Sequence, residues 1–483
     1  MKVIQGLHPQ SLWRNFWEIS QIPRESGNES KVSEYILSKA KALGMDCRLD
    51  ETRNVIVRKP GISGFAPIAL QSHTDMVCEK DRDTKHDFNT DPILLVRDGS
   101  WIRADHTTLG ADNGIGVAAM LSIMEDPALI HPHLDLLFTA EEETGLTGAY
   151  NLSRGSFSAP ALINLDSEEE GTFYIGCAGG MDTELILEPD FTTVPENTVP
   201  VGVKITGLRG GHSGVDIHQG LANAIKLLNR FLHATYEAYG FHLVSIRGGN
   251  KHNAIPREAE AVIHISRPDI DALKREAVHW NNIFRSEFSH IDDGVTLTLE
   301  ELDQSTHRVI EPGDTAKILN LLQAMPHGPL KIDPKLDNTV VTSTNLAVCS
   351  FKLDNFVVTT SQRSITQSAL HDMASQVASV GELAGCRVNK GNSYPAWKPD
   401  FSSPLLKKCT GLYHELLHKE PMVKIIHAGL ECAVIGERIK GLDMISFGPT
   451  IEQPHSPNER VNIDSVERFW DYLLALLRQL AGK

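Results

Sequence analysis

The chain of 483 residues lacks the features that define several protein classes. Its seven cysteines are odd in number, scattered and free of any C-x-x-C pair, which excludes a disulfide framework or a thiolate zinc cluster and favours a reducing compartment. No stretch approaches the roughly 20 consecutive apolar residues that a membrane span requires. Residues 1–20 contain no apolar core and no small-residue cleavage site, so a secretory signal is not expected. These absences predict a cytoplasmic protein without a membrane partner.

The sequence also lacks an excess of basic residues. Lys and Arg number 46 and Asp and Glu number 62, which gives a net charge of −16. Nucleic acids and anionic membranes attract basic surfaces, so neither is an expected partner. With 41% hydrophobic and 22% charged residues the composition is that of an ordinary globular enzyme. The length exceeds what one hydrophobic core normally supports, and we expect two or three domains.

The first part of the chain alternates helical and extended patterns. Apolar residues recur at helical spacing over residues 12–19 and 32–43, and Gly44 is placed to end the second helix. A further helix is predicted over residues 113–124. Apolar runs typical of strands occupy residues 54–57, 67–73, 134–140 and 161–166. This alternation predicts a layered α/β domain.

The pattern changes after residues 190–200, a polar stretch with two prolines that is typical of a linker. Beyond it the sequence predicts the order β-α-β-β-α-β of a ferredoxin-like unit. The predicted strands are residues 201–207, 241–247, 258–266 and 295–302, and the predicted helices are residues 217–234 and 269–288. A second, shorter helix-and-strand stretch follows over residues 312–392.

Residues 392–400 have the composition of a return linker, and the remaining chain is again α/β. It contains predicted helices at residues 404–418 and 464–481 and a strand at residues 443–448. We therefore predict an α/β catalytic domain in two segments, residues 1–190 and 395–483. An α+β lid domain, residues 195–392, is inserted between them.

Several apolar strands end at residues that can bind a metal ion. His73 and Asp75 follow one strand, Asp166 ends another, and His455 comes a short loop after a third; the glutamates Glu141, Glu142 and Glu143 follow residues 134–140. Open α/β sheets bind ligands at the carboxyl ends of their strands, so these groups are expected to meet in one crevice. Asp112 is a fifth candidate, placed to cap the helix at residues 113–124.

Each candidate alone has a plain structural explanation, as a helix cap, a turn or a solvated acidic loop. Together they form a set of oxygen and imidazole donors without thiolate, which suits zinc or a neighbouring divalent ion. Five ligands are too many for one tetrahedral zinc ion, but they suit two ions with one bridging carboxylate. Three ligand carboxylates and one hydroxide balance the charge of two divalent ions. The pattern thus indicates a two-metal hydrolase.

A series of motifs, in the same order, resembles the M20 metallopeptidases, the di-zinc aminopeptidase-like amidohydrolases. These motifs are HTDMV (73–77), LGADNGIG (109–116), EEETG (141–145), INLDSEE (163–169), GGHSG (210–214) and PHSPNE (454–459). Further motifs resemble the aminoacyl-histidine (Xaa-His) dipeptidase branch of that family: GCAGGMD (176–182), GGNKHNAIPRE (248–258), SQRS (361–364) and IHAGLEC (426–432). The resemblance covers nearly the whole chain.

The resemblance implies a zinc-peptidase-like α/β/α catalytic domain, a ferredoxin-like lid, and hydrolysis of unblocked dipeptides such as Xaa-His. It implies two zinc ions per subunit, with cobalt or manganese able to substitute. The implied ligands are His73, Asp112, Glu143, Asp166 and His455, with Asp112 bridging.

The resemblance also separates the roles of the three adjacent glutamates. Glu143 is implied to be a metal ligand, Glu142 the general base for the bridging water, and Glu141 a solvent-facing residue. Asp75, two residues after His73, is suited to accept the second imidazole N–H, which fixes the tautomer of the ligand.

In the lid, the resemblance makes His212 of GGHSG a candidate donor to the tetrahedral oxyanion, with a turn histidine as the alternative. Arg363 is a candidate clamp for the substrate carboxylate, or else a surface arginine. Asn253 is a candidate contact for substrate polar groups, or else a turn residue, and Gly429 offers a backbone amide. His427 and Glu431 receive no role.

Relatives of this family commonly dimerise through such lids. The resemblance therefore implies a homodimer in which His212 of one subunit completes the site of the other.

A rival motif is H-E-x-x-H in YHELLHKEP (413–421), a zinc signature that would use His414 and His418. Against it, the predicted helix buries the face of Leu405, Cys409 and Leu412, both histidines fall on the other face, and no third ligand is evident. Two further alternatives stay open. One is an amidohydrolase acting on tripeptides or N-acyl amino acids, and the other is a non-catalytic peptide-binding relative, although no ligand or base is missing here.

Overall fold

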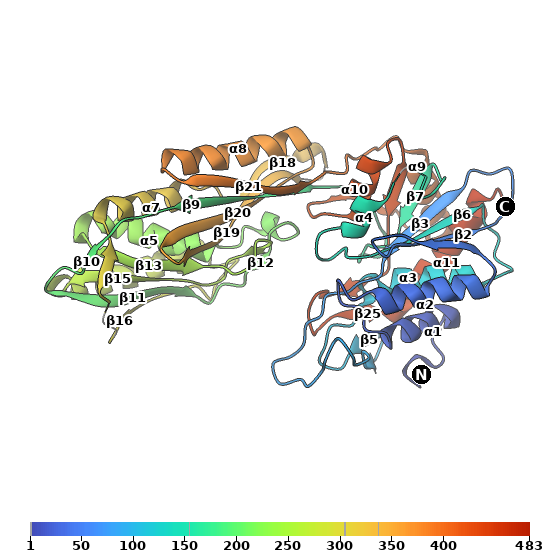
Figure 1. The fold of residues 1–483 in the computed structure, drawn as a ribbon, viewed down its shortest axis with the longest axis horizontal. Helices are drawn as coiled ribbons and strands as arrows, with labels where there is room; N and C mark the ends of the chain where they lie inside the picture. Colours follow the sequence, from blue (N-terminus) through green and yellow to red (C-terminus); the bar gives the residue numbers. More distant parts are fainter. Residues whose placement is uncertain (1, 154, 304–305, 337) are drawn as a thin grey trace. The chain divides into compact units, whose positions relative to one another are not determined.

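The computed structural model describes residues 2–153, 155–303, 306–336 and 338–483, which form two compact units (Figure 1). The first unit comprises residues 1–176, 397–425 and 430–483, and the second comprises residues 177–396 and 426–429. Each unit has its own hydrophobic core. The second unit starts at Cys177 and not near residue 195, because the strand that follows Cys177 pairs within the second sheet.

The first unit is built on a mixed sheet with the strand order β1-β2-β6-β3-β7-β23-β8-β22. Its central strands β6, β3, β7 and β23 are parallel to one another. From β3 the chain continues to β6 on one side, and from β6 it returns past β3 to β7 on the other side. The connections thus reverse direction at these strands, and open α/β sheets bind ligands at the carboxyl ends of the strands where this happens. The strands are β1 (Asp46–Leu49), β2 (Val55–Lys59), β3 (Ile68–His73), β6 (Leu134–Thr139), β7 (Ala161–Asn164), β8 (Thr172–Cys177), β22 (Met422–Ile426) and β23 (Asp443–Ser446).

Helices cover both faces of this sheet. Figure 1 shows α1 (Gln10–Ser20), α2 (Ser30–Ala42), α3 (Ala111–Glu125) and α11 (Ile463–Leu480) on one side, and α4 (Thr147–Asn151) and α10 (Glu431–Arg438) on the other. Strands β3 and β6 are consequently buried along their whole lengths. A sheet with helices on both faces confirms the layered α/β domain that the alternating pattern of the sequence predicts.

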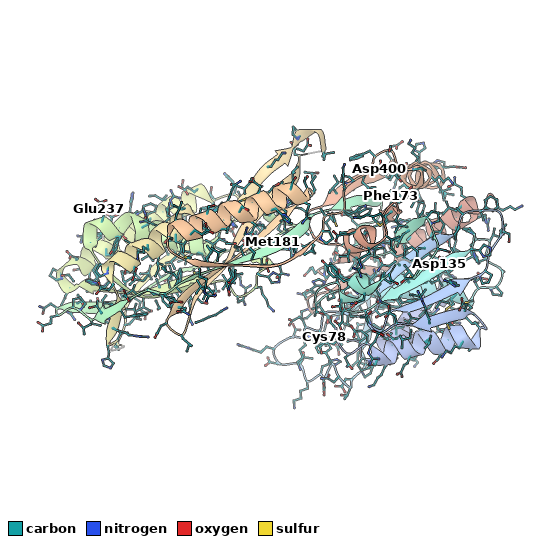
Figure 2. The ribbon with its side chains drawn as sticks, turned by 45° about the horizontal axis from the view of Figure 1, so that its top comes forward. Cys78, Asp135, Phe173, Met181, Glu237 and Asp400 are labelled. Atoms are coloured by element: carbon teal, nitrogen blue, oxygen red, sulfur yellow. The ribbon has the colours of Figure 1, made fainter. Side chains whose placement is uncertain are left out.

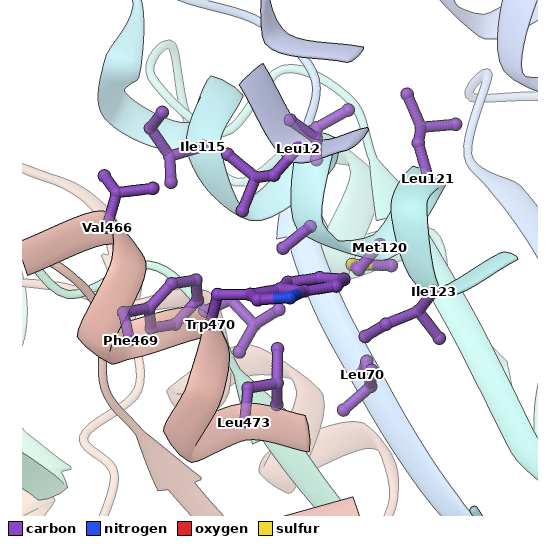
Figure 3. Close-up of a cluster of buried hydrophobic side chains, with 14 of the residues drawn as sticks. Leu12, Leu70, Ile115, Met120, Leu121, Ile123, Val466, Phe469, Trp470 and Leu473 are labelled. Carbon is purple, nitrogen blue, oxygen red and sulfur yellow. The ribbon is translucent and has the colours of Figure 1, made fainter. Parts of the chain in front are cut away.

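The core beneath the sheet joins segments that are far apart in the sequence. Leu12 of α1, Leu70 of β3, Met120 of α3 and Trp470 of α11 pack in one buried cluster (Figure 3). Aromatic rings also join the N-terminal and the C-terminal segments of the first unit. Phe173 of β8 (labelled in Figure 2) lies with its ring centre 5.7 Å from that of Tyr413 and 5.5 Å from that of Phe447, both edge-on. Tyr413 belongs to α9 (Pro404–Leu417). Aromatic contacts of this kind add to the burial of the rings themselves.

A small antiparallel sheet positions the loop that contains His455. Its strand order is β24 (Ile451–Glu452), β25 (Arg460–Asn462), β5 (Trp101–Ala104) and β4 (Leu95–Asp98). Because Glu452 pairs with Arg460, residues 453–459 form a tight connection between adjacent strands. Gln453 and His455 have φ values of 52° and 58°, in the left-handed region that non-glycine residues seldom adopt.

The second unit contains the predicted ferredoxin-like fold. Strand order β16-β11-β15-β13 in the sheet corresponds to the sequence order 4-1-3-2 of that fold. The elements are β11 (Thr198–Thr206), α5 (Ala224–Tyr239), β13 (His242–Gly248), β15 (Ala259–Ser266), α6 (Ile270–Glu287) and β16 (Thr296–Glu301).

The same fold occurs a second time in this unit, with the first copy inserted after its first strand. The sheet continues as β19-β20-β9-β21, which is the order 2-3-1-4, and the two copies meet where Gly248 of β13 pairs with Cys349 of β19. The elements of the second copy are β9 (Gly179–Leu187), α7 (Pro312–Ala324), β19 (Thr339–Lys352), β20 (Asn355–Ser364), α8 (Gln367–Leu383) and β21 (Arg387–Tyr394), with β18 (Gly328–Asp333) added beside β19.

Two details of this unit differ from the sequence-based prediction. Residues 217–234 do not form one helix. Ile217–Gln219 form a single 3₁₀ turn, and α5 begins at Ala224 because the Asn223 side chain accepts hydrogen bonds from the backbone N–H groups of Ile225 and Lys226. Residues 190–200 are not a linker, because they contribute β10 (Phe191–Thr193), which pairs with β17 (Arg308–Ile310), and the start of β11.

Two further observations bear on the chemistry of the chain. All seven cysteines are free thiols. Within the described ranges, no helix combines the length and the apolar character needed to cross a membrane.

Candidate metal centre

Asp112 lies between two histidines that come from distant parts of the first unit. Its Oδ1 is 3.1 Å from Nε2 of His73, and its Oδ2 is 3.1 Å from Nε2 of His455. His73 ends the central strand β3 and is 1% exposed, whereas the side chain of His455 is 50% exposed. One carboxylate thus directs one oxygen toward each imidazole.

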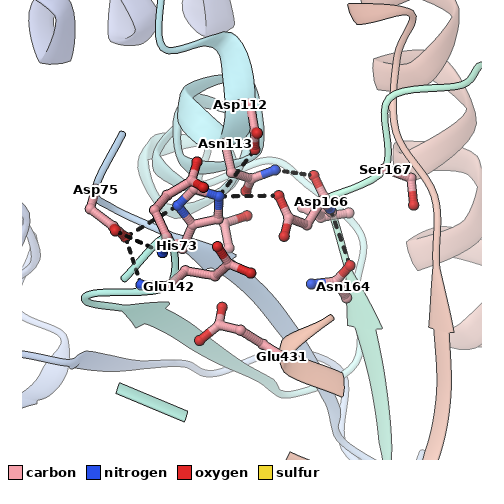
Figure 4. A network of polar contacts seen from close by, with 12 residues as sticks. His73, Asp75, Asp112, Asn113, Glu142, Asn164, Asp166, Ser167 and Glu431 are labelled. Carbon is pink, nitrogen blue, oxygen red and sulfur yellow. Dashed lines mark hydrogen bonds and ion pairs between the residues drawn. The ribbon is translucent and has the colours of Figure 1, made fainter. Parts of the chain in front are cut away.

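Each histidine also faces a second carboxylate. Nε2 of His73 is 3.3 Å from Oδ1 of Asp166, which follows β7, and Nε2 of His455 is 3.1 Å from Oε1 of Glu143, which follows β6. The ligand atoms of His73, Asp112 and Glu143 all lie within 4.8 Å of one another. The five predicted ligands therefore form two groups of three that share Asp112. Figure 4 shows the His73 side of this arrangement.

These side chains fit a pair of divalent cations. Oδ1 of Asp166 and Oε1 of Glu143 are buried and accept no hydrogen bond from the residues that the structure describes, although each lies close to a histidine nitrogen. The hydrogen on Nε2 of a histidine can serve only one acceptor. The oxygens left without a donor are therefore suited to a cation, and the mixture of carboxylate and imidazole donors is one that zinc, cobalt and manganese accept.

The pKa values at this site reflect a surplus of buried negative charge. Burial disfavours a charged imidazole, but contact with Asp112 and Glu143 outweighs it and raises the pKa of His455 to about 12. Burial, with repulsion from Asp112 and Glu143, raises the pKa of Asp166 to about 7 despite the nearby His73. Burial alone would raise the pKa of Asp112, yet the two histidines hold it below its usual value. Bound cations would relieve this repulsion between carboxylates.

A buried glutamate fixes the position of Asp112. Oε2 of Glu459 accepts the backbone N–H groups of Leu109 and Gly110 at 2.7 and 2.9 Å, and Oε1 accepts that of Ala111 at 2.7 Å. The N–H of Asp112 lies 3.3 Å from the same Oε1. The carboxylate therefore takes up the N–H groups at the start of α3. The side chain of Asp112 does not cap this helix, because its two oxygens face the histidines.

Asp75 connects the first histidine to the loop of glutamates. Its Oδ1 lies 3.2 Å from Nδ1 of His73 and accepts the backbone N–H of Glu142 at 3.1 Å. Its Oδ2 accepts the N–H of Glu143 at 3.1 Å and the Ser26 hydroxyl at 2.7 Å. One buried carboxylate thus orients the imidazole and also fixes the backbone from which Glu142 and Glu143 project.

The three adjacent glutamates have different surroundings. The side chain of Glu143 is 7% exposed and faces His455. The carboxylate of Glu142 lies beside His73 in Figure 4, where burial and the neighbouring Glu143 raise its pKa well above the usual range. Glu141 has a φ of 52° at the turn after β6, and its backbone N–H is bound by Glu29 at 3.0 Å. The turn therefore sends successive side chains in different directions.

The predicted lid residues gather in the second unit around Gly214. A Cβ on Gly214 would lie 2.3 Å from the carbonyl oxygen of His427, 3.1 Å from the ring of His212 and 3.2 Å from Nε of Arg363. Only a glycine fits at this point. The backbone carbonyl of Asn253 accepts the N–H of Ser213 at 2.8 Å, which holds Asn253 beside the same loop.

Further contacts define the environment of these lid residues. The guanidinium of Arg363 donates to the Tyr394 hydroxyl at 2.6 Å, and the ring of Tyr394 also lies against Gly429. His427 is buried and lies 2.8 Å from the Ser343 hydroxyl, and burial, with the nearby Arg363 charge, lowers its pKa to about 3. A cavity of about 910 Å³ in the second unit is lined by residues that include His212 and Asn253.

The H-E-x-x-H motif does not form a site in the structure. His418 ends α9 in the left-handed conformation, and Nδ1 of His414 is 2.9 Å from the exposed carboxylate of Glu420. Neither histidine belongs to the group of potential metal ligands found among the described residues.

Sequence reasoning missed two residues that hold the centre together. Glu459 stands in the motif PHSPNE, but nothing in the pattern indicates that it accepts backbone N–H groups 350 residues away. Arg24, which is 2% exposed, donates to the backbone carbonyls of Thr74 and Asp75 at 3.0 and 2.8 Å and also to that of Gly110. An isolated arginine near a helix end carries no signal of such a role.

Comparison with known proteins gives consistent results. Residues 203–292 match the model of the peptidase dimerisation domain of the M20 group. The chain is 39% identical to the cytosol non-specific dipeptidase of Escherichia coli (strain K12) over 487 residues, which cover 100% of both proteins. The crystal structure of aminoacylhistidine dipeptidase from Vibrio alginolyticus matches with a TM-score of 0.84 at 37% identity, covering 99% of this chain and 98% of that one. Human carnosine dipeptidase 1, with a TM-score of 0.54 and 12% identity over 100% and 98% of the two chains, shares the fold.

Metal removal is expected to destabilise the first unit. A ligand that binds only the folded state stabilises it by about 4 kcal/mol at a thousandfold excess over its Kd. Chelation at neutral pH should therefore lower the melting temperature in scanning calorimetry, and added zinc should restore it. The variant Asp112→Asn should lose most of this response, whereas Asp105→Asn, at an exposed position, should keep it. An unchanged melting temperature after verified metal removal would contradict the assignment.

Proposed function

This chain belongs to the M20 family of metallopeptidases, and from that premise we propose that it hydrolyses the peptide bond of unblocked dipeptides, Xaa-His dipeptides among them. The observation that carries the proposal is the position of Asp112, which directs one oxygen toward each of two histidines beside the carboxylate of Glu142. Two relatives that match nearly the whole chain are dipeptidases by name.

We propose that the centre holds two zinc ions, with cobalt or manganese as substitutes. His73, Asp112 and Asp166 would hold one ion, and His455, Asp112 and Glu143 the other, with Asp112 as the ligand that both would share. When bound, such ions polarise the peptide carbonyl and lower the pKa of water toward neutrality.

Glu142 is the proposed general base. It takes a proton from the attacking water and returns it to the amine of the departing amino acid. Asp75 supports this role by fixing the backbone N–H groups of both Glu142 and Glu143, which keeps the base and the ligand in separate positions. Asp75 also orients His73, so a single carboxylate aligns a ligand and the base.

His212 is the proposed donor to the oxyanion of the tetrahedral intermediate. Its Nδ1 accepts the backbone N–H groups of Gly214 and Val215 at 3.2 and 3.0 Å. In the neutral ring the hydrogen then resides on Nε2. In this tautomer Nε2 can donate a hydrogen bond to the oxyanion. The backbone of the GGHSG loop therefore selects the tautomer that this role requires.

Arg363, Asn253 and Gly429 are the proposed substrate-binding residues. The guanidinium of Arg363 is buried and oriented by Tyr394, and its Nε has no partner among the described residues, so it can pair with a substrate carboxylate. A residue that binds the terminal carboxylate of the substrate would favour a leaving group of one residue. A tripeptide would move that carboxylate by roughly 3.5 Å.

We also propose that the chain is cytoplasmic and forms a homodimer through the lid, since residues 203–292 match a dimerisation domain. One edge of this domain is already covered, because β13 pairs with β19 of the second ferredoxin-like copy. The dimer contact therefore uses another part of the lid, such as the outer strands β16 or β21.

A substrate panel tests the proposed activity. We expect kcat/KM for unblocked dipeptides, including β-alanyl-histidine, to exceed that for tripeptides and N-acetyl amino acids by at least about tenfold. The panel should be measured on zinc-loaded enzyme, with Glu142→Ala purified in the same way as the control for contaminating peptidases. A preference for N-acyl amino acids or for tripeptides would replace the dipeptidase assignment with the corresponding amidohydrolase.

The three adjacent glutamates should separate in their effects. Glu142→Ala should keep its metal and lose about 10²- to 10⁴-fold in kcat, the usual contribution of a general base. Glu143→Ala should lower the metal content measured by mass spectrometry. Glu141→Ala is the matched control and should change neither quantity substantially. Full activity in Glu142→Ala would refute the mechanism.

Complementation tests whether His212 acts across the dimer. Coexpression of Glu142→Ala and His212→Ala gives mixed dimers in which one site combines an intact Glu142 with the partner's intact His212. Random pairing should return about a quarter of the wild-type sites. If mixed dimers form but the mixture stays inactive, His212 acts within its own chain.

A further inference from the structure

Glu431 is a buried acidic residue for which the proposed mechanism has no use. It starts helix α10, is 0% exposed and belongs to the first unit, within the motif IHAGLEC. In Figure 4 its carboxyl group lies directly across from that of Glu142, on the side away from Asp112. An unpaired carboxylate in such a position is costly, so its retention calls for a physical explanation.

One oxygen of Glu431 is held by two neutral donors at the ends of the central strands. Oε2 accepts hydrogen bonds from Nε2 of Gln71 at 2.5 Å and from the Thr139 hydroxyl at 2.7 Å. Oε1 of Gln71 in turn accepts the side-chain amide of Asn164 at 2.6 Å. The oxygen of Asn164 accepts the backbone N–H of the ligand Asp166 at 3.2 Å. These bonds leave the Glu431 side chain a single orientation beneath the metal centre.

The other oxygen, Oε1, is buried and has no hydrogen-bond partner among the described residues. If the group were ionised, this oxygen would carry charge with no donor, close to the carboxylate of Glu142. If it is protonated, the hydrogen on Oε1 can be directed toward the carboxylate of Glu142, which lies across from it in Figure 4.

We propose that Glu431 is a positioning residue for Glu142: its neutral carboxyl group donates a hydrogen bond from Oε1 to one oxygen of the Glu142 carboxylate. This inference rests on the proposed role of Glu142 as general base. The hydrogen bond occupies one oxygen of the base and leaves the other free to face the attacking water. Glu431 keeps its proton throughout the reaction and exchanges nothing with substrate.

The arrangement explains the polar layer below the centre. Thr139 and Gln71 are neutral donors that fix Oε2, so the hydrogen on Oε1 is the one part of the Glu431 side chain left to interact with the site. The chain of bonds from Asp166 through Asn164 and Gln71 to Glu431 also ties the base to the same strand ends that carry the ligands. These bonds thereby fix the position of Glu142 relative to the metal ligands.

Three variants test the proposal. Glu431→Gln can still accept from Gln71 and Thr139 and donate an amide N–H to Glu142, so kcat should stay within about threefold of wild type. Glu431→Leu cannot donate and should lower kcat by about 100-fold, toward the loss expected for the base itself, with KM and metal content unchanged.

Thr139→Val, which removes one donor to Oε2, should lower kcat by about fivefold at constant KM. Glu437→Leu, at an exposed position on the same helix, is the matched control.

The measurements are kcat and KM on a dipeptide, metal content and melting temperature. Glu431→Gln as inactive as Glu431→Leu would show that negative charge and not hydrogen-bond donation matters, and would overturn the proposal. Wild-type kcat in Glu431→Leu, or loss of metal together with kcat, would overturn it as well. If Glu431→Leu does not fold, Glu431→Gln and Thr139→Val decide, and an unchanged kcat in Thr139→Val counts against the proposal. Wild-type turnover of dipeptides separately verifies the reaction on which the inference rests.

Discussion

The confinement of several carboxylates around Asp112 is the constraint on which the rest of the first unit depends. Asp112, Glu143, Asp166 and Glu142 lie close together with little access to solvent, where their mutual repulsion would oppose folding without compensating positive charge. Some of that compensation comes from His73 and His455, and the donor geometry accommodates two divalent cations for the remainder. The surrounding structure holds these groups at short range by hydrogen bonds to the backbone N–H and C=O groups of the loops that carry them.

Acidic residues outside the ligand set do much of this positioning. Glu459 collects the backbone N–H groups that precede Asp112, and Asp75 collects those of Glu142 and Glu143. Arg24 donates to the backbone carbonyls of Thr74 and Asp75, which follow β3, and to that of Gly110, which precedes Asp112. Charged side chains thus bind the free backbone groups of both loops, and such hydrogen bonds are stronger than those between neutral groups. In our proposal Glu431 adds a neutral donor to this scheme and holds the base as the others hold the ligands.

In the second unit, the sheet and a glycine position the side chains of His212 and Arg363. Two ferredoxin-like copies share one sheet through β13 and β19, which gives the lid a large core of its own. On this frame the GGHSG loop, β20 and the segment containing His427 converge on Gly214, where the absence of a side chain allows the close approach. The same loop supplies the backbone N–H groups that bind Nδ1 of His212. A rigid sheet with a glycine at the point of contact thus orients an imidazole and a guanidinium.

The sequence by itself determined the layered α/β class, the inserted ferredoxin-like fold and the family, because apolar periodicity and ordered motifs are local properties of the chain. Residues at strand ends such as His73 and Asp166 could be proposed as ligands for the same reason, since parallel strands bring their carboxyl ends to one edge. Only the tertiary structure decided that Asp112 directs one oxygen toward each histidine, that Glu459 holds its loop, and that the polar stretch at residues 190–200 is part of a sheet. It also showed that the ferredoxin-like fold occurs twice, because the first strand of the second copy, β9, is separated from its helix α7 by the whole first copy. Contacts between residues hundreds of positions apart leave no periodicity in the sequence, and so their partners could not be read from it.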